Sequence, residues 1–161
     1  MKKHEWIFWG LTVAGIGGVA YYLFTRRKAQ DMGFSFPTAD HTITSGFGLR
    51  VNPTNGETGE FHNGIDLRAA KGDPIYAPAD GTVSSVYSNT AGGNQLIIQH
   101  SGGFKSGYAH LSAYNVGEGQ RVKKGQIIAY SGDTGNVTAA HLHFTLHDPL
   151  GAYLDPAKYL S

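Results

Sequence analysis

The chain has 161 residues, enough for one domain with a sizeable core and little besides, and it contains no cysteine, which excludes disulfides and thiolate metal sites. Its 23 glycines are about twice the ~7% average share, which favours a turn-rich β fold over a helical bundle. The charge is unevenly distributed: residues 1–30 carry five basic and one acidic side chain, whereas residues 31–161 carry eight basic and eleven acidic side chains. The second part has no run of basic residues suited to binding a phosphate backbone, so we expect no nucleic-acid partner.

A hydrophobic segment follows the short basic N-terminus of residues 1–5. The run from Trp6 to Phe24 contains no charge, and its 19 residues would form a helix roughly 28 Å long, close to the ~30 Å hydrocarbon core of a bilayer. Trp and Tyr residues lie at its two ends, where the membrane interface favours them. A cleavable signal peptide is the alternative, but no small-x-small cleavage site follows. We therefore predict a transmembrane helix over residues 6–25, and basic residues on both flanks leave its orientation open.

The remainder is predicted to be a linker, residues 26–39, and a single domain, residues 40–161. Short extended runs alternate with Gly, Asn, Asp and Pro, and no segment of the domain shows a sustained helical period. This pattern predicts an all-β fold built on an antiparallel sheet, with one helical turn near residues 156–160. The candidate strands are residues 81–87, 95–100, 107–111, 126–131 and 141–147.

The motif His141-Leu142-His143 carries the first chemical signal. Side chains two apart on a strand share a face, so both imidazoles are expected to project into one space while Leu142 faces the core. His62 and Asp66 offer two more ligands from a glycine-containing stretch. Two neutral imidazoles and a carboxylate, with one position open for water, are typical of a catalytic zinc site. The sequence therefore indicates metal-assisted hydrolysis.

A series of short motifs resembles the lysostaphin-type (LytM-type) peptidoglycan endopeptidase domain. The resemblance covers roughly residues 40–160. It rests on Thr44-Ser45-Gly46-Phe47-Gly48-Leu49-Arg50, His62-Asn63-Gly64-Ile65-Asp66, Gly72-Asp73-Pro74-Ile75-Tyr76-Ala77, Asp80-Gly81-Thr82-Val83, Tyr108-Ala109-His110-Leu111-Ser112, Gly132-Asp133-Thr134-Gly135 and His141-Leu142-His143-Phe144. It implies an antiparallel sheet at the floor of a loop-walled groove and hydrolysis of peptide bonds in bacterial cell walls.

The resemblance also implies roles for individual residues. One zinc ion would be held by His62, Asp66 and His143, and the catalytic non-ligand histidines would be His110 and His141. We expect His141 to accept a proton from water and His110 to assist the oxyanion or the leaving amine, and these two roles could be exchanged. Two departures from the family pattern concern the shape of the groove. Thr145 replaces a common acidic residue, and Ala139-Ala140 replaces a common Gly-Pro.

Several interpretations of the biological role stay open. The first is a membrane-anchored zinc endopeptidase, placed on the cell-wall side of a bacterial inner membrane or of a phage particle's membrane, that cuts peptidoglycan cross-links. The second is a non-catalytic peptidoglycan-binding or activator module with the same fold. A swinging-arm carrier domain is a remote third, because it leaves the five site residues unexplained. The bond that is cut, the oligomeric state and any activator are not determined by the sequence.

Overall fold

The structure is a computed structural model that describes residues 4–51, 56 and 58–161, with side chains from residue 17 onward. Two compact units divide the chain. The N-terminal unit is Met1–Met32 and the C-terminal unit is Gly33–Ser161. Each unit has its own architecture, a single helix in the first and a set of β-sheets in the second.

The N-terminal unit contains one α-helix, α1 (His4–Asp31). The helix continues beyond the predicted boundary at residue 25, because Arg26-Arg27-Lys28-Ala29-Gln30 consists of strong helix formers. It stops where Gly33 takes a φ of +57°, the left-handed conformation that favours glycine just past a helix end. The segment predicted as a linker, residues 26–39, is thus helical in its first six residues.

The transmembrane prediction concerns the first part of α1. Its residues 6–16 are helical in backbone, but their side chains lie outside the described part of the chain. Within the described residues, no helix combines the length and the apolar character that crossing a membrane requires. The membrane span over residues 6–25 therefore stays a prediction.

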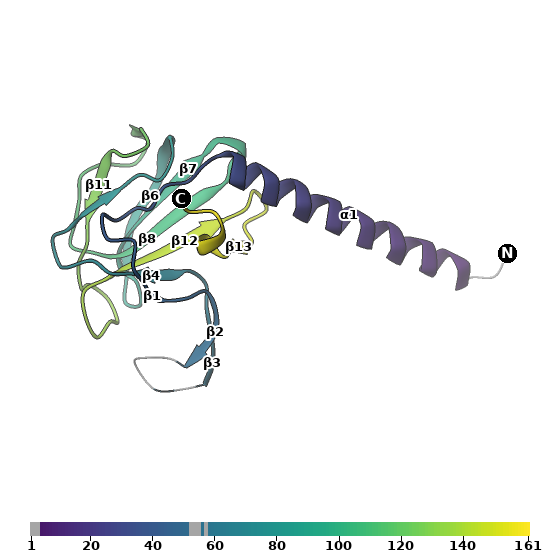
Figure 1. Cartoon of the computed structure of the whole chain (residues 1–161), viewed down its shortest axis with the longest axis horizontal. Coiled ribbons are helices and arrows are strands. Elements are labelled where there is room, and N and C mark those ends of the chain that lie inside the picture. The colour runs from purple at the N-terminus through teal and green to yellow at the C-terminus, as the bar shows by residue number, and fades with distance from the viewer. Residues whose placement is uncertain (1–3, 52–55, 57) are drawn as a thin grey trace. The chain divides into compact units, whose positions relative to one another are not determined.

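The C-terminal unit is dominated by one large antiparallel sheet (Figure 1). Its strand order is β1-β4-β12-β8-β7-β6-β10, and β13 pairs with β12. The bounds are β1 Ile43–Ser45, β4 Ile65–Leu67, β6 Gly81–Asn89, β7 Gly93–His100, β8 Lys105–Leu111, β10 Arg121–Val122, β12 Leu142–His147 and β13 Tyr153–Leu154. The predicted antiparallel all-β architecture is confirmed.

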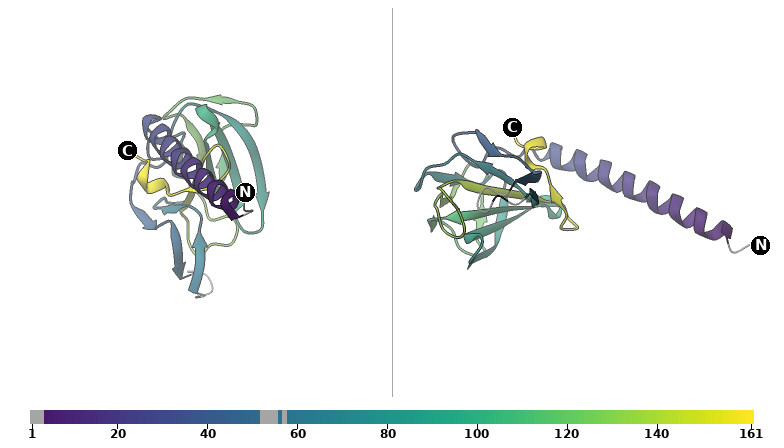
Figure 2. Two further views of the ribbon diagram at one scale, coloured as in Figure 1. Left: turned by 90° about the vertical axis from the view of Figure 1, so that its right-hand side faces the viewer. Right: turned by 90° about the horizontal axis from the view of Figure 1, so that it is seen from below.

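Two smaller sheets complete this unit. One has the order β5-β11-β9, formed by β5 Pro74–Tyr76, β9 Ala113–Tyr114 and β11 Ile127–Tyr130. The other is a two-stranded ribbon of β2 Gly48–Val51 and β3 Thr58–His62, which extends away from the large sheet (Figure 1 and the left view of Figure 2). Two short 3-10 helices, η1 Ser101–Gly103 and η2 Pro156–Lys158, are also present. The helical turn predicted near the C-terminus corresponds to η2.

The core lies on one face of the central strands. In β12, Leu142 and Phe144 are fully buried in the main hydrophobic cluster, and in β4 Ile65 and Leu67 are buried in the same cluster. Burying each such side chain stabilises the fold by roughly 1.5–3 kcal/mol. Because strand side chains alternate, the residues between them are directed to the opposite face. That face carries His143 and the site described below.

The segment after α1 belongs to the C-terminal unit. Phe34 is fully buried and forms a parallel bridge with Leu160. The backbone N–H of Ser35 donates to the carbonyl of Pro78 at 2.9 Å. Residues 34–39, predicted as part of a linker, are therefore part of the folded domain. Removing the Phe34 side chain from water stabilises this arrangement.

Candidate active site

Strand register brings two distant side chains together on the polar face of the large sheet. In the pairing of β4 with β12, Asp66 lies directly opposite His143, although 77 residues separate them in sequence. His62 ends β3 and reaches the same place through a short turn. Gly64 permits this approach, since a Cβ there would lie 3.0 Å from Cε1 of His143 and 2.9 Å from Cγ2 of Thr145. The glycine is required by close contact with β12.

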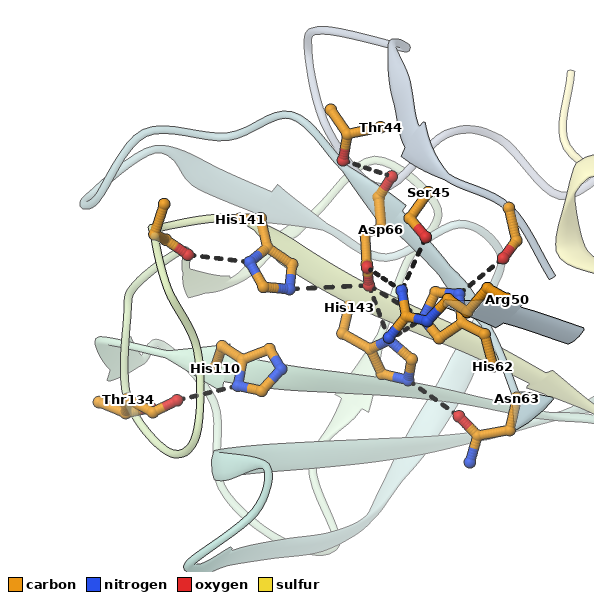
Figure 3. Close-up of polar contacts among 12 residues, drawn as sticks. Thr44, Ser45, Arg50, His62, Asn63, Asp66, His110, Thr134, His141 and His143 are labelled. Atoms are coloured by element: carbon orange, nitrogen blue, oxygen red, sulfur yellow. Dashed lines mark hydrogen bonds and ion pairs between the residues drawn. The ribbon is translucent and has the colours of Figure 1, made fainter. Parts of the chain in front are cut away.

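Three polar atoms meet at this point (Figure 3). The separation between His143 Nδ1 and Asp66 Oδ1 is 2.9 Å, between His62 Nε2 and Asp66 Oδ1 3.1 Å, and between His62 Nε2 and His143 Nδ1 3.0 Å. We refer to His62, Asp66 and His143 as the acceptor cluster. His62 and Asp66 are buried, and the His143 side chain is 18% exposed.

The outer nitrogens of the two imidazoles indicate their tautomers. Nδ1 of His62 lies 2.7 Å from the carbonyl oxygen of Gly46, which can only accept, so that nitrogen carries the proton. Nε2 of His143 lies 3.1 Å from Oδ1 of Asn63, which also accepts. Each neutral ring therefore presents a lone pair to the cluster centre. Carbonyl and amide partners of this kind are what orient histidine ligands in metal sites.

Three acceptor atoms at such short separations repel one another unless a positive charge lies among them. A tetrahedral zinc ion holds nitrogen and oxygen ligands about 3.3 Å apart, so a slight outward shift of the side chains admits the ion. Within the described residues, the acceptor cluster is the group of His and carboxylate side chains that could hold a metal ion. The donor set therefore fits the predicted metal.

Arg50 supports the carboxylate from the outer side. Its Nη1 donates to Oδ2 of Asp66 at 3.0 Å and to Oγ of Ser45 at 2.7 Å, and its Nε lies 3.4 Å from Oε2 of Glu60. This pairing with a permanently charged guanidinium stabilises the ionised form of Asp66. Asp66 is therefore ionised, with Oδ1 directed into the cluster and Oδ2 paired with Arg50.

Two more imidazoles lie beside the cluster. His110, near the end of β8, and His141, just before β12, have ring centroids 4.8 Å apart. Nε2 of His141 is 3.6 Å from Oδ1 of Asp66. We call His110 and His141 the histidine pair. His141 lies one residue before the strand that was predicted to include it, in an isolated bridge with Gly132, yet its ring reaches the carboxylate as the alternation predicted.

Backbone carbonyls orient the rings of the histidine pair as well. Nδ1 of His110 donates to the carbonyl oxygen of Thr134 at 2.9 Å, and Nδ1 of His141 donates to that of Ala139 at 2.9 Å (Figure 3). In the neutral rings Nε2 is then the free acceptor. Burial lowers the pKa of His110 to about 4, so this ring is neutral at physiological pH.

An open cavity of about 380 Å³ gives access to these groups. Its lining includes His62, His110 and His143 together with Arg50 and Asn63. A larger cavity of about 490 Å³ lies elsewhere, against Asp80 and His100, and none of the five predicted site residues lines it. Three of the five predicted site residues therefore line the smaller of these two cavities.

Comparison with known families agrees with this arrangement. The model of peptidase family M23 matches residues 60–156, a span that includes the acceptor cluster and the histidine pair. This chain belongs to peptidase family M23. The predicted resemblance to a lysostaphin-type domain and the prediction of a metallopeptidase domain are confirmed. The individual roles of the five site residues remain predictions.

Named relatives share this M23 domain. Peptidoglycan DD-endopeptidase ShyB of Vibrio cholerae is 41% identical over 126 residues, which cover 74% of this chain and 29% of the relative. Glycyl-glycine endopeptidase ALE-1 of Staphylococcus capitis is 43% identical over 101 residues, covering 62% of this chain and 28% of the relative. A crystal structure of a zinc-containing peptidase from V. cholerae superimposes with a TM-score of 0.69 at 38% identity, covering 76% of this chain and 39% of that chain. The chain thus spans less than a third of the length of these curated relatives.

Sequence reasoning missed the residues that orient the site. Asn63 lies within a recognised motif, but nothing local indicates that its amide faces His143. Arg50 also lies within a recognised motif, but nothing local indicates that it pairs directly with Asp66. The carbonyls of Gly46, Thr134 and Ala139 carry no sequence signal, because every residue has a carbonyl group.

Proposed function

We propose that this chain is a zinc-dependent endopeptidase that hydrolyses peptide bonds in the cross-links of bacterial peptidoglycan. The observation that carries the proposal is the acceptor cluster, in which three atoms within 3.1 Å of one another present lone pairs or negative charge to a common centre. Zinc is favoured by the donor set, two imidazole nitrogens and one carboxylate oxygen. The related V. cholerae peptidase, whose fold this chain shares, is itself a zinc-containing protein.

The substrate class follows from the names of the relatives. ShyB is named a peptidoglycan DD-endopeptidase, and ALE-1 a glycyl-glycine endopeptidase. These names describe two different peptide bonds, so we assign the shared class, a peptide bond of the cell wall, and leave the choice of bond to product analysis.

The residues around the cluster suggest a division of labour. A zinc ion held by the acceptor cluster would polarise the scissile carbonyl and increase the acidity of water. Nε2 of His141 lies 3.6 Å from Oδ1 of Asp66, beside the cluster, so we assign it to accept the proton that water loses as its oxygen bonds to the carbonyl carbon. His110 is neutral with Nε2 as an acceptor, so it would first take up at Nε2 the second proton of the attacking water, from the tetrahedral intermediate. Its low pKa then suits release of that proton to the leaving amine nitrogen as the C–N bond breaks.

We further propose that α1 anchors the enzyme to a membrane, with the M23 domain on the cell-wall side. The uncharged run of 19 residues from Trp6 to Phe24 supports this, as do the exposed apolar side chains of Val19, Leu23 and Phe24 on the described part of the helix. The setting would be either a bacterial inner membrane or the membrane of a phage particle. Extraction of membranes at alkaline pH checks the anchor. The full chain should stay in the pellet, and recovery in the supernatant would contradict anchoring.

Purified full chain provides the decisive test of activity. Zinc content is measured by mass spectrometry, and hydrolysis of purified peptidoglycan is followed through release of new amino termini, before and after chelation and zinc restoration. We expect one zinc per chain and hydrolysis that chelation abolishes. Binding to peptidoglycan without new amino termini would favour the non-catalytic module instead, and the absence of zinc would refute the proposed chemistry.

A further inference from the structure

His110 has an unusual backbone conformation. Among the described residues it is the only non-glycine with positive φ, at 64°. Its backbone N–H donates to the carbonyl of Gly92 at 2.8 Å. A residue with a side chain adopts this region only where its surroundings impose it, and such residues concentrate at functional sites. The contacts that hold His110 in place are therefore part of the site.

One loop supplies the contacts to both members of the histidine pair. We call residues 131–140, between β11 and His141, the orienting loop. Gly132 lies against the backbone of His110, where a Cβ would be 2.8 Å from the His110 carbonyl oxygen, and it also bridges to His141. The carbonyls of Thr134 and Ala139 accept from the two rings. The directions of both imidazoles thus depend on this loop.

The hydroxyl of Thr134 attaches the orienting loop to the sheet. Oγ1 donates to the carbonyl of Leu111 at 2.8 Å and accepts from the backbone N–H of Asn94 at 3.0 Å. Asn94 and Leu111 lie opposite each other in the pairing of β7 with β8, and Leu111 directly follows His110. The same residue whose carbonyl orients the His110 ring is therefore bound, through its side chain, to the strand that carries His110.

Close backbone packing strengthens this attachment. A Cβ on Gly93 would collide with the backbone and Oγ1 of Thr134, and a Cβ on Gly135 would lie 2.6 Å from the carbonyl oxygen of Ala91. The backbone N–H of Asn136 donates to that same Ala91 carbonyl at 2.9 Å. The loop is thus in direct backbone contact with the start of β7 and the turn before it, at Thr134, Gly135 and Asn136.

We propose that Thr134 is a positioning residue of this enzyme, whose hydroxyl sets the direction of the His110 imidazole by anchoring the orienting loop to β7 and β8. The inference rests on the proposed peptidase function, because the ring direction matters for proton transfer to the leaving amine. Proton transfer requires Nε2 within hydrogen-bond reach of the reacting atom, so a small rotation of the ring lowers turnover more than it lowers substrate binding.

Three single variants of the full chain test this proposal. Thr134→Val keeps the side-chain size and removes both hydroxyl bonds, and Thr134→Ser keeps the hydroxyl. Thr138→Val is the matched control, because Thr138 is exposed in the same loop and makes no side-chain hydrogen bond within the described part of the chain. With soluble cross-linked peptidoglycan fragments, we expect Thr134→Val to lower kcat about 10- to 100-fold with KM and zinc content unchanged. Thr134→Ser and Thr138→Val should stay within about threefold of the original chain.

Imidazole NMR gives a readout that needs no activity. The Nδ1 proton of His110 should be visible and protected from exchange in the original chain and in Thr134→Ser, and lost in Thr134→Val. An unchanged signal in Thr134→Val would overturn the proposal, as would equal loss of kcat in the Val and Ser variants, which would assign the effect to packing. If the original chain cuts no peptidoglycan, the proposed function fails, and the NMR signal still decides whether Thr134 orients His110.

Discussion

The acceptor cluster and the histidine pair surround the same carboxylate, but different structural elements hold them. His143 and Asp66 stand on paired strands of the large sheet, where register sets their separation. His110 and His141 are instead directed by carbonyl groups of the orienting loop. Strands surrounded by core side chains resist displacement, whereas a loop depends on a few hydrogen bonds. The comparison indicates a metal-holding group in which strand register places two of the three members, beside a pair whose ring directions depend on the orienting loop.

The largest expected effect comes from breaking the acceptor cluster. His143→Ala removes one of three ligands, so bound zinc and hydrolysis of peptidoglycan should both be lost. His147→Ala is the matched control, because His147 lies on the same strand and the same face but packs against Tyr153 and is not part of the cluster. Zinc content by mass spectrometry decides, and a His143→Ala protein with a full equivalent of zinc would exclude this residue as a ligand.

Removing one member of the histidine pair should show that the pair and the acceptor cluster have different roles. His141→Ala and His110→Ala are each expected to lower turnover by ~10²–10⁴-fold while zinc remains bound, because a positioned proton donor or acceptor contributes that much. Turnover on soluble peptidoglycan fragments and zinc content are measured on the same preparations. Parallel loss of zinc and turnover would show that the histidine pair belongs to the metal site, and would contradict separate roles for the pair and the acceptor cluster.

A smaller effect is expected from the groups that orient the ligands. Asn63→Ala removes the acceptor for Nε2 of His143, which should weaken zinc affinity by about 10- to 100-fold, as loss of an outer hydrogen bond does in metal sites. Competition with a chelator of known affinity measures the change. Asn136→Ala is the control, since Asn136 lines the same cavity and its side chain makes no hydrogen bond among the described residues. Equal zinc affinity in the two variants would argue against ligand orientation by Asn63.

The smallest effect concerns pH and the burial of His110. In metal-free protein its pKa is lowered from 6.5 to about 4, chiefly by burial. The unfolded chain therefore binds a proton at higher pH than the folded chain does, and the free energy of unfolding should decrease as pH falls from 6.5 to about 4. NMR titration of His110, with the urea-unfolded protein as control, measures the two pKa values. Equal values would refute the effect of burial.

The comparison also explains which parts of the site could be predicted. The spacing of His141 and His143 predicts a shared face, because side-chain alternation is a local property of a strand. The motif from His62 to Asp66 contains a glycine, and the structure shows that close contact with β12 requires it. The orienting contacts of Arg50 and Asn63 could not be predicted, because each joins residues that only the folded sheet brings together.

The fold also has elements that the sequence predicts and elements that it does not. The five predicted strands correspond to β6, β7, β8, β11 and β12, most of which are long enough to show a pattern. Strands such as β9 and β10 have two residues each and carry no periodicity. The start of the domain was placed at residue 40, whereas Phe34 is already buried in it and Phe36 packs against its core. Two aromatic residues in a short irregular segment leave no repeating signal.

The sequence by itself determined the β class and the family, and it predicted five candidate site residues, since these depend on short motifs and local alternation. Tertiary structure decided the tautomers, the pairing of Asp66 with Arg50 and the attachment of the orienting loop through Thr134. Those features depend on which carbonyl or charged group lies at hydrogen-bond distance from each ring. Such distances arise from packing between segments far apart in the chain, where a shift of about one ångström breaks a hydrogen bond.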